Sequence, residues 1–213
     1  TGLTSTKSCF IINGPKDCGK STLFDLFQRA VGKDAVIRSI SEKVFVNKTY
    51  SSDTQSELSA IADGLRFGYS SELKDNQQIN ADQIKRLTGG DRMTARQLYQ
   101  SEQHFKSVCK LWVFTNFIPK FDIQDEALIS RMVCFPFKHQ FKVSCVNTPI
   151  EEMDKDLDAV FSFMCVNAHK FIKENKNFEH LSSKSMKDFK SQIIKDKDPL
   201  SDFWANFSAI PKF

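Results

Sequence analysis

Several features that define common protein classes are missing from this 213-residue sequence. Its apolar runs are about four or five residues long, far short of the roughly 20 residues that cross a bilayer. No signal peptide is visible either, so we expect no membrane partner. Its six cysteines contain no C-x-x-C pair, which argues against a zinc finger and favours free thiols in a reducing compartment. With eight glycines, six prolines and 40% hydrophobic residues, the composition also excludes a fibre and a disordered chain.

A strong net charge is missing as well, because the whole chain carries only +4. The distribution of this charge is more informative than its size. Between Lys85 and Lys110 there are six basic and two acidic residues, so this segment accounts for the entire excess. Such a cluster favours an anionic partner, and a solvated basic face is the alternative. Its basic residues are Lys85, Arg86, Arg92, Arg96, Lys106 and Lys110.

Hydrophobic periodicity predicts an α/β fold. A buried strand at Ser8–Asn13 and a helix at Lys20–Val31 flank a glycine-containing loop. Strands that alternate with helices favour a mainly parallel central sheet between two helical layers. From Pro149 the spacing is helical, so we expect a core over residues 1–148 and a helical appendage over residues 149–213. Further strands are expected at Leu65–Ser71, Lys110–Thr115 and 133–137, helices at 58–63, Asn80–Leu87 and Asp125–Met132, and a hairpin between Met93–Tyr99 and His104–Val108.

The stretch Gly14–Ser21 matches the pattern G-x-x-x-x-G-K-[ST] of phosphate-binding loops. In such a loop successive backbone N–H groups point at phosphate oxygens, which only glycine allows at the tight points, and the next helix adds its positive end. Lys20 would bridge the β- and γ-phosphates, and the Ser21 hydroxyl would bind Mg²⁺. ATP and Mg²⁺ are therefore the expected cofactors. The candidate nucleotide-binding residues are Gly14, Pro15, Lys16, Asp17, Cys18, Gly19, Lys20, Ser21 and Thr22.

This loop alone does not identify the reaction, since kinases, GTPases, motor ATPases and non-hydrolysing sensors share it. The GTPase motif Asn-Lys-x-Asp is missing, because Asn47–Tyr50 reads Asn-Lys-Thr-Tyr. A hydrolysing enzyme also needs an acid near the γ-phosphate. Glu72, with Asp75 one turn on, follows an expected strand and could supply it, or both could be solvated acids. Asn116 ends the run "LWVFTN", where it could bind the attacking water or the γ-phosphate, or form a turn.

The order of these segments resembles that of the superfamily 3 helicases within the AAA+ ATPases. The resemblance rests on "IKRLTGGDRMTARQLY", on the asparagine-ended strand with "NFIPKF" behind it, and on "DEALISRMVCFPF". It is greatest to the primase-helicases of large DNA viruses, of the poxvirus type, and of phages and plasmids, and it spans about residues 8–140. It implies an AAA+ type P-loop NTPase fold and an ATP-dependent DNA helicase that translocates on DNA as a hexameric ring.

The resemblance also implies roles for individual residues. Arg131 would be an arginine finger that reaches into a neighbouring subunit's site, and its alternative is a helix C-terminal arginine that satisfies the helix dipole. Where many AAA+ proteins have an aspartate before the catalytic glutamate, this chain has Ser71, which raises the prospect of slow hydrolysis. The remaining roles are Lys20 as the phosphate lysine, Ser21 and Glu72 as Mg²⁺ ligands, Glu72 as the catalytic acid and Asn116 as the first sensor.

In these helicases a hairpin ahead of the sensor strand projects into the central channel and grips one DNA strand. Here it would span about residues 93–108. Its cations would attract phosphates whatever the base sequence, and its aromatic side chains could stack on a base. The candidate nucleic-acid contacts are Arg92, Arg96, Tyr99, His104 and Lys106.

The implied partners are single-stranded or forked DNA, further copies of the chain, and other replication proteins or an N-terminal primase region. Because the sequence starts at Thr1 and not at Met, we expect it to be part of a longer protein. The expected location is the cytoplasm: that of a host cell, or its viral factory, for a viral protein, and that of a bacterium for a phage or plasmid protein.

Two alternatives from other classes remain open. A small nucleoside or nucleotide kinase would share the loop, but it would leave the Asn116 strand and the basic hairpin unexplained. A replication initiator that binds ATP and DNA with negligible turnover also remains open, because of Ser71. The rate of ATP hydrolysis with and without single-stranded DNA separates all three.

Overall fold

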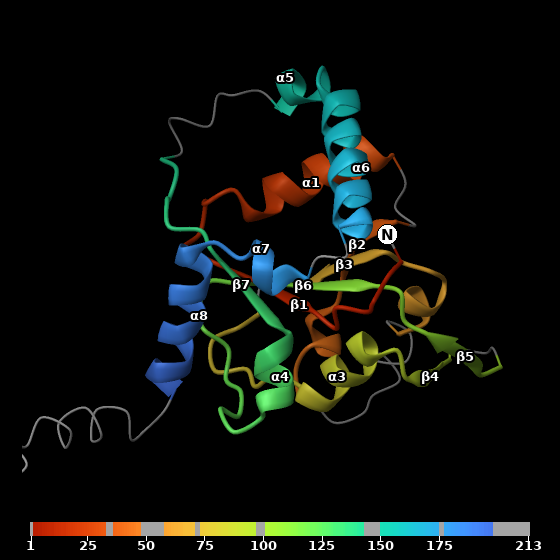
Figure 1. The fold of residues 1–213 in the computed structure, drawn as a ribbon, viewed down its shortest axis with the longest axis vertical. Coiled ribbons are helices and arrows are strands. Elements are labelled where there is room, and N and C mark those ends of the chain that lie inside the picture. The colour runs from red at the N-terminus through yellow and green to blue at the C-terminus, as the bar shows by residue number, and fades with distance from the viewer. Residues whose placement is uncertain are drawn as a thin grey trace, which may run out of the picture.

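A five-stranded parallel β-sheet forms the centre of the computed structural model, which describes residues 2–32, 36–47, 58–70, 73–96, 101–142, 150–174 and 177–197 (Figure 1). The strand order is β2-β3-β6-β1-β7, and every pairing is parallel. Parallel strands share one direction, so their carboxyl ends lie together at one end of the sheet. The strands are β1 (Cys9–Asn13), β2 (Ile37–Ile40), β3 (Phe67–Ser70), β6 (Lys110–Thr115) and β7 (Met132–Pro136).

Helices cover both faces of this sheet and make a three-layer structure (Figure 1). On one face α1 (Lys20–Val31) packs Phe24 against Phe114 and Trp112, with ring centroids 4.8 Å and 5.0 Å away. On the other face α3 (Ala81–Gly89), α4 (Glu126–Arg131) and α8 (Lys184–Lys197) bury their apolar side chains in a larger core. β1 is buried on both faces, which explains its uninterrupted apolar run.

The remaining elements lie around this core. The strands β4 and β5 form a separate antiparallel hairpin that projects from the body beyond α3 (Figure 1). After β7, α6 packs against α1, whereas α8 packs against β7. Among the described residues, no helix combines the length and the hydrophobicity needed to span a bilayer. These elements are η1 (Glu42–Val44), a helical stretch at residues 58–62, β4 (Arg92–Ala95), β5 (Gln103–Lys106), α5 (Ile150–Asp154), α6 (Leu157–Lys173) and α7 (Phe178–Leu181).

The predicted α/β fold, with its parallel central sheet and C-terminal helices, is confirmed. The expected helix Lys20–Val31 and strand Lys110–Thr115 have the observed bounds. The helix expected from Asn80 does begin there: the Asn80 side chain accepts the N–H of Gln83 at 3.0 Å and caps α3. Residues 58–62 are helical as expected, although the proposed capping box at residues 54–57 lies outside the described residues.

One strand of the sheet was not predicted. In β2, Ile37 and Ile40 are buried while the two residues between them are exposed, so the alternation that marks a half-buried strand is missing. β2 is placed by its parallel neighbour β3, with Ile37 opposite Phe67. The predicted division between a core of residues 1–148 and a helical appendage stays a prediction. One later helix does contribute to the core, since Ile193 of α8 belongs to the same hydrophobic cluster as the sheet.

Candidate functional site

The segment Gly14–Ser21, called the phosphate-binding loop below, connects β1 to α1 and depends on its two glycines. A Cβ atom on Gly14 would lie 2.3 Å from the carbonyl oxygen of Phe137, so any larger residue would push the backbone aside. Gly19 caps α1 with a φ of 86°, in the left-handed region that glycine adopts without strain. The loop is therefore a cradle of backbone at a helix N-terminus, the arrangement that binds phosphate groups in proteins.

Lys20 turns back into this loop and is only 5% exposed. Its Nζ atom donates to the carbonyl oxygens of Gly14 at 2.8 Å and Pro15 at 2.7 Å, and to Oδ1 of Asn116 at 2.9 Å. The Sγ atom of Cys18 lies 3.3 Å from the same nitrogen. In the described part of the chain, no carboxylate forms an ion pair with Lys20. A buried ammonium whose hydrogen-bond acceptors are all neutral lacks a compensating negative charge, and an anion bound in the loop would supply it.

The sheet brings Asn116 to the phosphate-binding loop. β1 and β6 are neighbours, with Asn13 opposite Thr115 in register, so residue 116 emerges beside the start of the loop. The side chain of Asn116 thereby reaches Lys20 from a position 96 residues away in the sequence. Two of the four residues expected to carry catalysis are in direct contact.

The loop residues line a cavity of about 300 Å³ at the N-terminus of α1, between Lys16 and Thr22. Ser21 is exposed there, and its hydroxyl is the kind of hard oxygen ligand that Mg²⁺ prefers. No group of three or more His, Cys, Asp or Glu side chains among the described residues could hold a metal by itself. A larger cavity of about 420 Å³, beneath α6 and α7, has a mainly apolar lining that includes Phe10 and Trp112.

Two predicted site residues, Glu72 and Tyr99, lie outside the described residues. The residues on either side of Glu72's segment do contact β6: the Phe114 N–H donates to Ser70 Oγ at 3.1 Å, and the Leu73 N–H donates to the Phe114 carbonyl at 3.1 Å. Asp75, the alternative acid, is exposed, and its carboxylate accepts the N–H of its neighbour Asn76.

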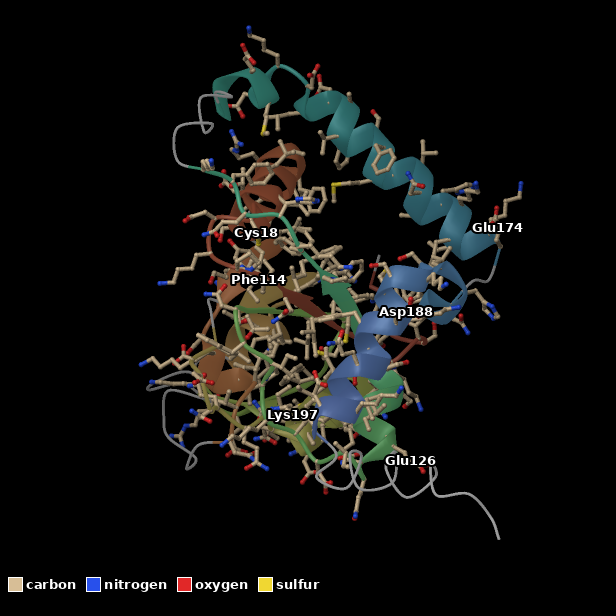
Figure 2. All side chains as sticks on the ribbon, turned by 90° about the vertical axis from the view of Figure 1, so that its left-hand side faces the viewer. Cys18, Phe114, Glu126, Glu174, Asp188 and Lys197 are labelled. Carbon is tan, nitrogen blue, oxygen red and sulfur yellow. The ribbon has the colours of Figure 1, made fainter. Side chains whose placement is uncertain are left out.

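Arg131 lies far from the phosphate-binding loop of its own chain. It ends α4 immediately before β7, and Met132 pairs with Cys9 at the start of β1, whereas the loop follows the other end of β1. Along the strand direction, the five residues of β7 separate Arg131 from the end of the sheet where the loop lies, a distance of about 16 Å. In Figure 2 the start of α4, marked by Glu126, is likewise well below Cys18 of the loop. Arg131 therefore cannot contact a phosphate bound in its own chain.

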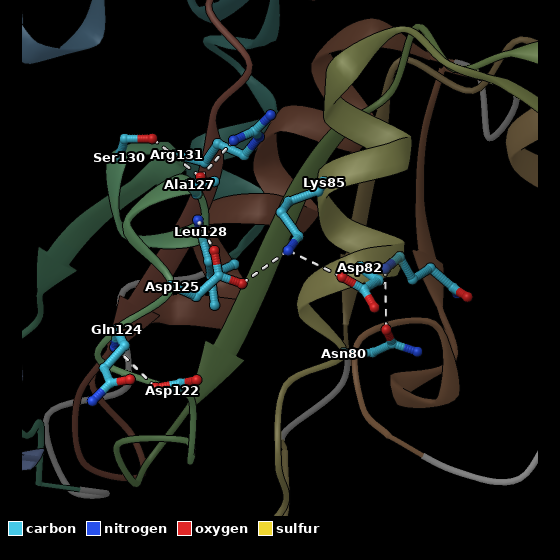
Figure 3. Close-up of polar contacts among 11 residues, drawn as sticks. Asn80, Asp82, Lys85, Asp122, Gln124, Asp125, Ala127, Leu128, Ser130 and Arg131 are labelled. Carbon is cyan, nitrogen blue, oxygen red and sulfur yellow. Dashed lines mark hydrogen bonds and ion pairs between the residues drawn. The ribbon is translucent and has the colours of Figure 1, made fainter.

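The local contacts of Arg131 match the helix-end alternative. Its Nη1 atom donates to the carbonyl oxygen of Ala127 in the same helix, while Nε has no hydrogen-bond partner among the described residues (Figure 3). The other end of α4 is capped by Asp125, whose Oδ1 atom accepts the N–H of Leu128 at 2.9 Å. The second carboxylate oxygen of Asp125 lies 2.9 Å from Lys85 Nζ, so an ion pair joins α3 to α4.

Replacing Asp125 with alanine should lower the free energy of unfolding by about 1–2 kcal/mol, because the helix loses its N-cap and its tie to Lys85. The hydrogen bond from Lys85 holds the pKa of Asp125 below its ordinary value of 3.8, and the Leu128 N–H acts in the same direction. The unfolded chain therefore binds more protons at low pH, so this stabilisation is complete at neutral pH and is lost as the pH falls through the folded pKa.

Urea unfolding of the wild type and the Asp125→Ala variant at pH 7 and at pH 3 measures this effect. The difference in free energy of unfolding between the two proteins should be smaller at pH 3 than at pH 7. Asp82→Ala is the matched control, because Asp82 also pairs with Lys85 but its side chain is 89% exposed. The free energy of unfolding of Asp82→Ala should stay within about 0.5 kcal/mol of the wild-type value. Equal losses for the two variants would contradict the capping role.

The predicted hairpin is present and carries its cations on one face. Arg92 of β4 pairs directly with Lys106 of β5, and Thr94 pairs with His104 two residues further along the ladder. All four side chains are exposed, whereas Met93, Ala95 and Phe105 point into the core. Two like charges directly opposite each other destabilise a two-stranded ladder. A phosphate backbone between them would turn this repulsion into attraction. Arg96, which follows β4, is exposed as well.

The segment that follows β7 borders the phosphate-binding loop, a contact that was not predicted from the sequence. The N–H of Phe137 donates to the carbonyl of Asn13 at 2.7 Å, and the N–H of Phe141 donates to the carbonyl of Asp17 at 2.9 Å. Residues 137–142 thus run alongside the phosphate-binding loop. Phe137 at the end of an expected strand and Phe141 shortly after it were the available signal, but no local pattern indicates that β7 lies next to β1.

Comparison with known proteins gives a family match and several viral relatives. The model of a family described as "Family of unknown function (DUF5906)" matches residues 12–131, which is more than half of the chain. "Putative helicase L207/L206" of Acanthamoeba polyphaga mimivirus is 32% identical over 144 residues, or 66% of this chain and 14% of the relative. "Putative helicase 121R" of Invertebrate iridescent virus 3 is 27% identical over 152 residues, or 69% and 16%. "Putative helicase V13" of the Sputnik virophage is 26% identical over 166 residues, or 75% and 21%.

The resemblance to viral proteins that are named as helicases is thereby confirmed. This chain spans only 14% to 21% of the length of these relatives. Among solved structures, the apo A form of the NrS-1 C-terminal region superposes with a TM-score of 0.54 at 14% identity, over 71% of this chain and 35% of that one. At this identity the likeness concerns the fold.

Proposed function

This chain belongs to the family of unknown function DUF5906, and from that premise we propose that it is the ATPase domain of a DNA helicase of the superfamily 3 type, within the AAA+ ATPases. ATP and Mg²⁺ bind at the phosphate-binding loop. Subunits assemble into a hexameric ring, and hydrolysis moves DNA past the hairpin formed by β4 and β5. The names of the viral relatives support this proposal.

The observation that carries the proposal is the buried ammonium of Lys20. It is 5% exposed and is held by two loop carbonyls and Asn116, without a carboxylate partner among the described residues. A triphosphate in the cradle supplies the missing negative charge. The N-terminus of α1 supports the same reading, because no side chain caps it at Gly19 and the first N–H groups of a helix have no partner within the helix.

The strand order supports a nucleotide site at this end of the sheet. β1 leads through α1 towards β2 on one side, whereas β6 leads through α4 to β7 on the other side. Ligands of open parallel sheets bind at the carboxyl ends of the strands where the connections diverge in this way. In the proposal Asn116 senses the γ-phosphate, and Glu72 orients the attacking water. Ser21 and Glu72 would hold Mg²⁺, which would offset the negative charge of the phosphates.

Arg131 acts on a neighbouring subunit in this proposal. Its distance from the loop of its own chain supports a role in trans, because only a second copy can present it to a bound triphosphate. The arrangement makes each active site depend on an interface, so assembly and hydrolysis are coupled.

DNA binds the exposed face of the hairpin, where Arg92 and Lys106 attract phosphates and His104 stacks on bases. Tyr99 and Arg96 extend this surface in the proposal. β6 begins four residues after β5 ends, and it runs to Asn116 beside Lys20. One rigid strand of roughly 20 Å thus links the DNA-binding hairpin to the nucleotide site.

Hydrolysis and DNA binding test the proposal together. We expect single-stranded DNA to stimulate ATP hydrolysis by the wild-type protein, and we expect the Arg92→Ala/Lys106→Ala double variant to bind that DNA more weakly. Two fewer phosphate contacts should reduce the slope of log affinity against log salt by about 1.4. Fluorescence anisotropy with a labelled oligonucleotide at several salt concentrations measures this slope.

The matched control is Lys184→Ala/Lys187→Ala, which removes two exposed cations from α8. It should leave the slope unchanged. An unchanged slope in the hairpin variant would exclude the hairpin as the DNA-binding surface. Phosphate transfer to a small acceptor, without any effect of DNA, would identify the kinase alternative instead. Binding of ATP and DNA with negligible turnover would identify the initiator.

The wider setting is also part of the proposal. The chain acts in replication, together with other replication proteins or an N-terminal primase region, on single-stranded or forked DNA. For a viral protein the place of action is the host cytoplasm or a viral factory within it.

A further inference from the structure

Residues 137–142, which follow β7, hold an aromatic ring against the phosphate-binding loop. The Phe141 N–H donates to the carbonyl of Asp17, which fixes the backbone at this point. A Cβ atom on Gly19 would lie 3.7 Å from Cε2 of Phe141, so the ring borders the loop where α1 begins. Yet Phe141 is 55% exposed, and no aromatic ring among the described residues packs on it. An apolar ring thus borders a polar site while more than half of the residue's surface stays exposed.

The direction in which Lys20 points indicates which end of a bound nucleotide faces this ring. Lys20, the ligand of the β- and γ-phosphates under the proposed function, points its ammonium at Asn116 on the β6 side of β1. Phe141 follows β7, on the opposite side of β1. A triphosphate that directs its γ-phosphate towards Asn116 therefore directs its nucleoside towards the side where Phe141 lies.

We propose that Phe141 is the platform on which the base of the bound nucleoside triphosphate stacks. This inference rests on the proposed nucleotide site and adds the residue that recognises its base. Stacking uses the π-face that every base has, and the larger ring system of a purine covers more of a phenyl ring than a pyrimidine does. The site accordingly binds purine triphosphates more tightly than pyrimidine triphosphates.

Isothermal titration calorimetry of the protein with ATP, CTP and inorganic tripolyphosphate, each with Mg²⁺, tests this inference. Phe141→Ala should weaken ATP binding by about 5- to 100-fold, the range for loss of one base–aromatic stack. Tripolyphosphate has no base, so its affinity should not change. Phe141→Trp should restore ATP binding and add a fluorescence change on binding. The control is Phe163→Ala, which removes a 68% exposed phenyl ring from α6 and should change nothing.

The outcomes separate this inference from the function on which it rests. Wild-type protein that binds neither ATP nor tripolyphosphate would refute the nucleotide site itself. ATP binding that is equally tight in wild type and Phe141→Ala would overturn the stacking role and leave the site intact. An equal loss of ATP and tripolyphosphate affinity would also overturn it, because the ring would then act on the shape of the loop. Equal wild-type affinity for ATP and CTP would refute the purine preference.

Discussion

Replacing Lys20 with alanine is expected to reduce ATP turnover by roughly 10²- to 10³-fold, as removal of one electrostatic group that stabilises the reacting phosphate does. The residue supplies the positive charge enclosed by the phosphate-binding loop, and no other lysine or arginine contacts Asn116 among the described residues. ATP binding should weaken as well. At a concentration 100 times its dissociation constant, ATP stabilises a binding-competent protein by about 2.7 kcal/mol. This stabilisation raises the melting temperature of the wild type, and the rise should vanish in the variant.

The matched control for this experiment is Lys184→Ala, which removes an exposed lysine at the start of α8. It should hydrolyse ATP at the wild-type rate and keep the rise in melting temperature with ATP. Without ATP, Lys20→Ala should melt close to the wild type, because the lost bonds to Gly14 and Pro15 are offset by removal of a buried, unpaired charge. Full turnover in a folded Lys20→Ala protein would end the proposal of an ATPase site in this loop.

Replacing Arg131 with alanine is expected to lower ATP hydrolysis by about 10³-fold or more while ATP affinity stays close to the wild-type value, as for loss of an arginine finger. The reason is geometric: Arg131 lies at the opposite end of the sheet from the loop of its own chain. Hydrolysis under saturating ATP and ATP binding by calorimetry separate the two quantities. A large loss of ATP affinity would indicate that the side chain supports the fold of α4 and not the transition state.

Mixing the two inactive variants then tests whether the site is shared between subunits. In an equimolar mixture, Arg131→Ala subunits keep Lys20, and Lys20→Ala subunits keep Arg131. Random assembly of a ring places one of each in the productive order at about a quarter of the interfaces. ATPase activity should therefore recover to roughly a quarter of the wild-type rate. Activity that stays at the level of the separate variants would mean that each site is contained in one chain.

The phosphate-binding loop could be predicted from the sequence because its information is local. Two glycines at fixed spacing, a lysine at the helix start and an apolar strand before it specify one strand–loop–helix unit. The bounds of α1 follow from its amphipathic face and from Gly32, which ends it in the left-handed region. The hairpin was predictable for the same reason, since its two strands are adjacent in the sequence.

Non-local placements could not be predicted in this way. β2 has no alternating pattern, and its membership of the sheet depends on pairing with β3. The contact of Phe141 with the loop depends on β7 lying next to β1, a choice made by strand order. The loop's close fit around Gly14 likewise comes from Phe137, more than 120 residues away in the sequence.

By itself, the sequence determined which residue types could bind a phosphate and which segment carries the positive charge, because glycine spacing, helix periodicity and charge are properties of short stretches. Only the tertiary structure decided that Asn116 meets Lys20, that Arg131 lies at the opposite end of the sheet from its own loop, and that Phe141 borders that loop. The physical reason is that a parallel sheet pairs strands far apart in the chain, so the end at which a side chain emerges is set by strand order and direction.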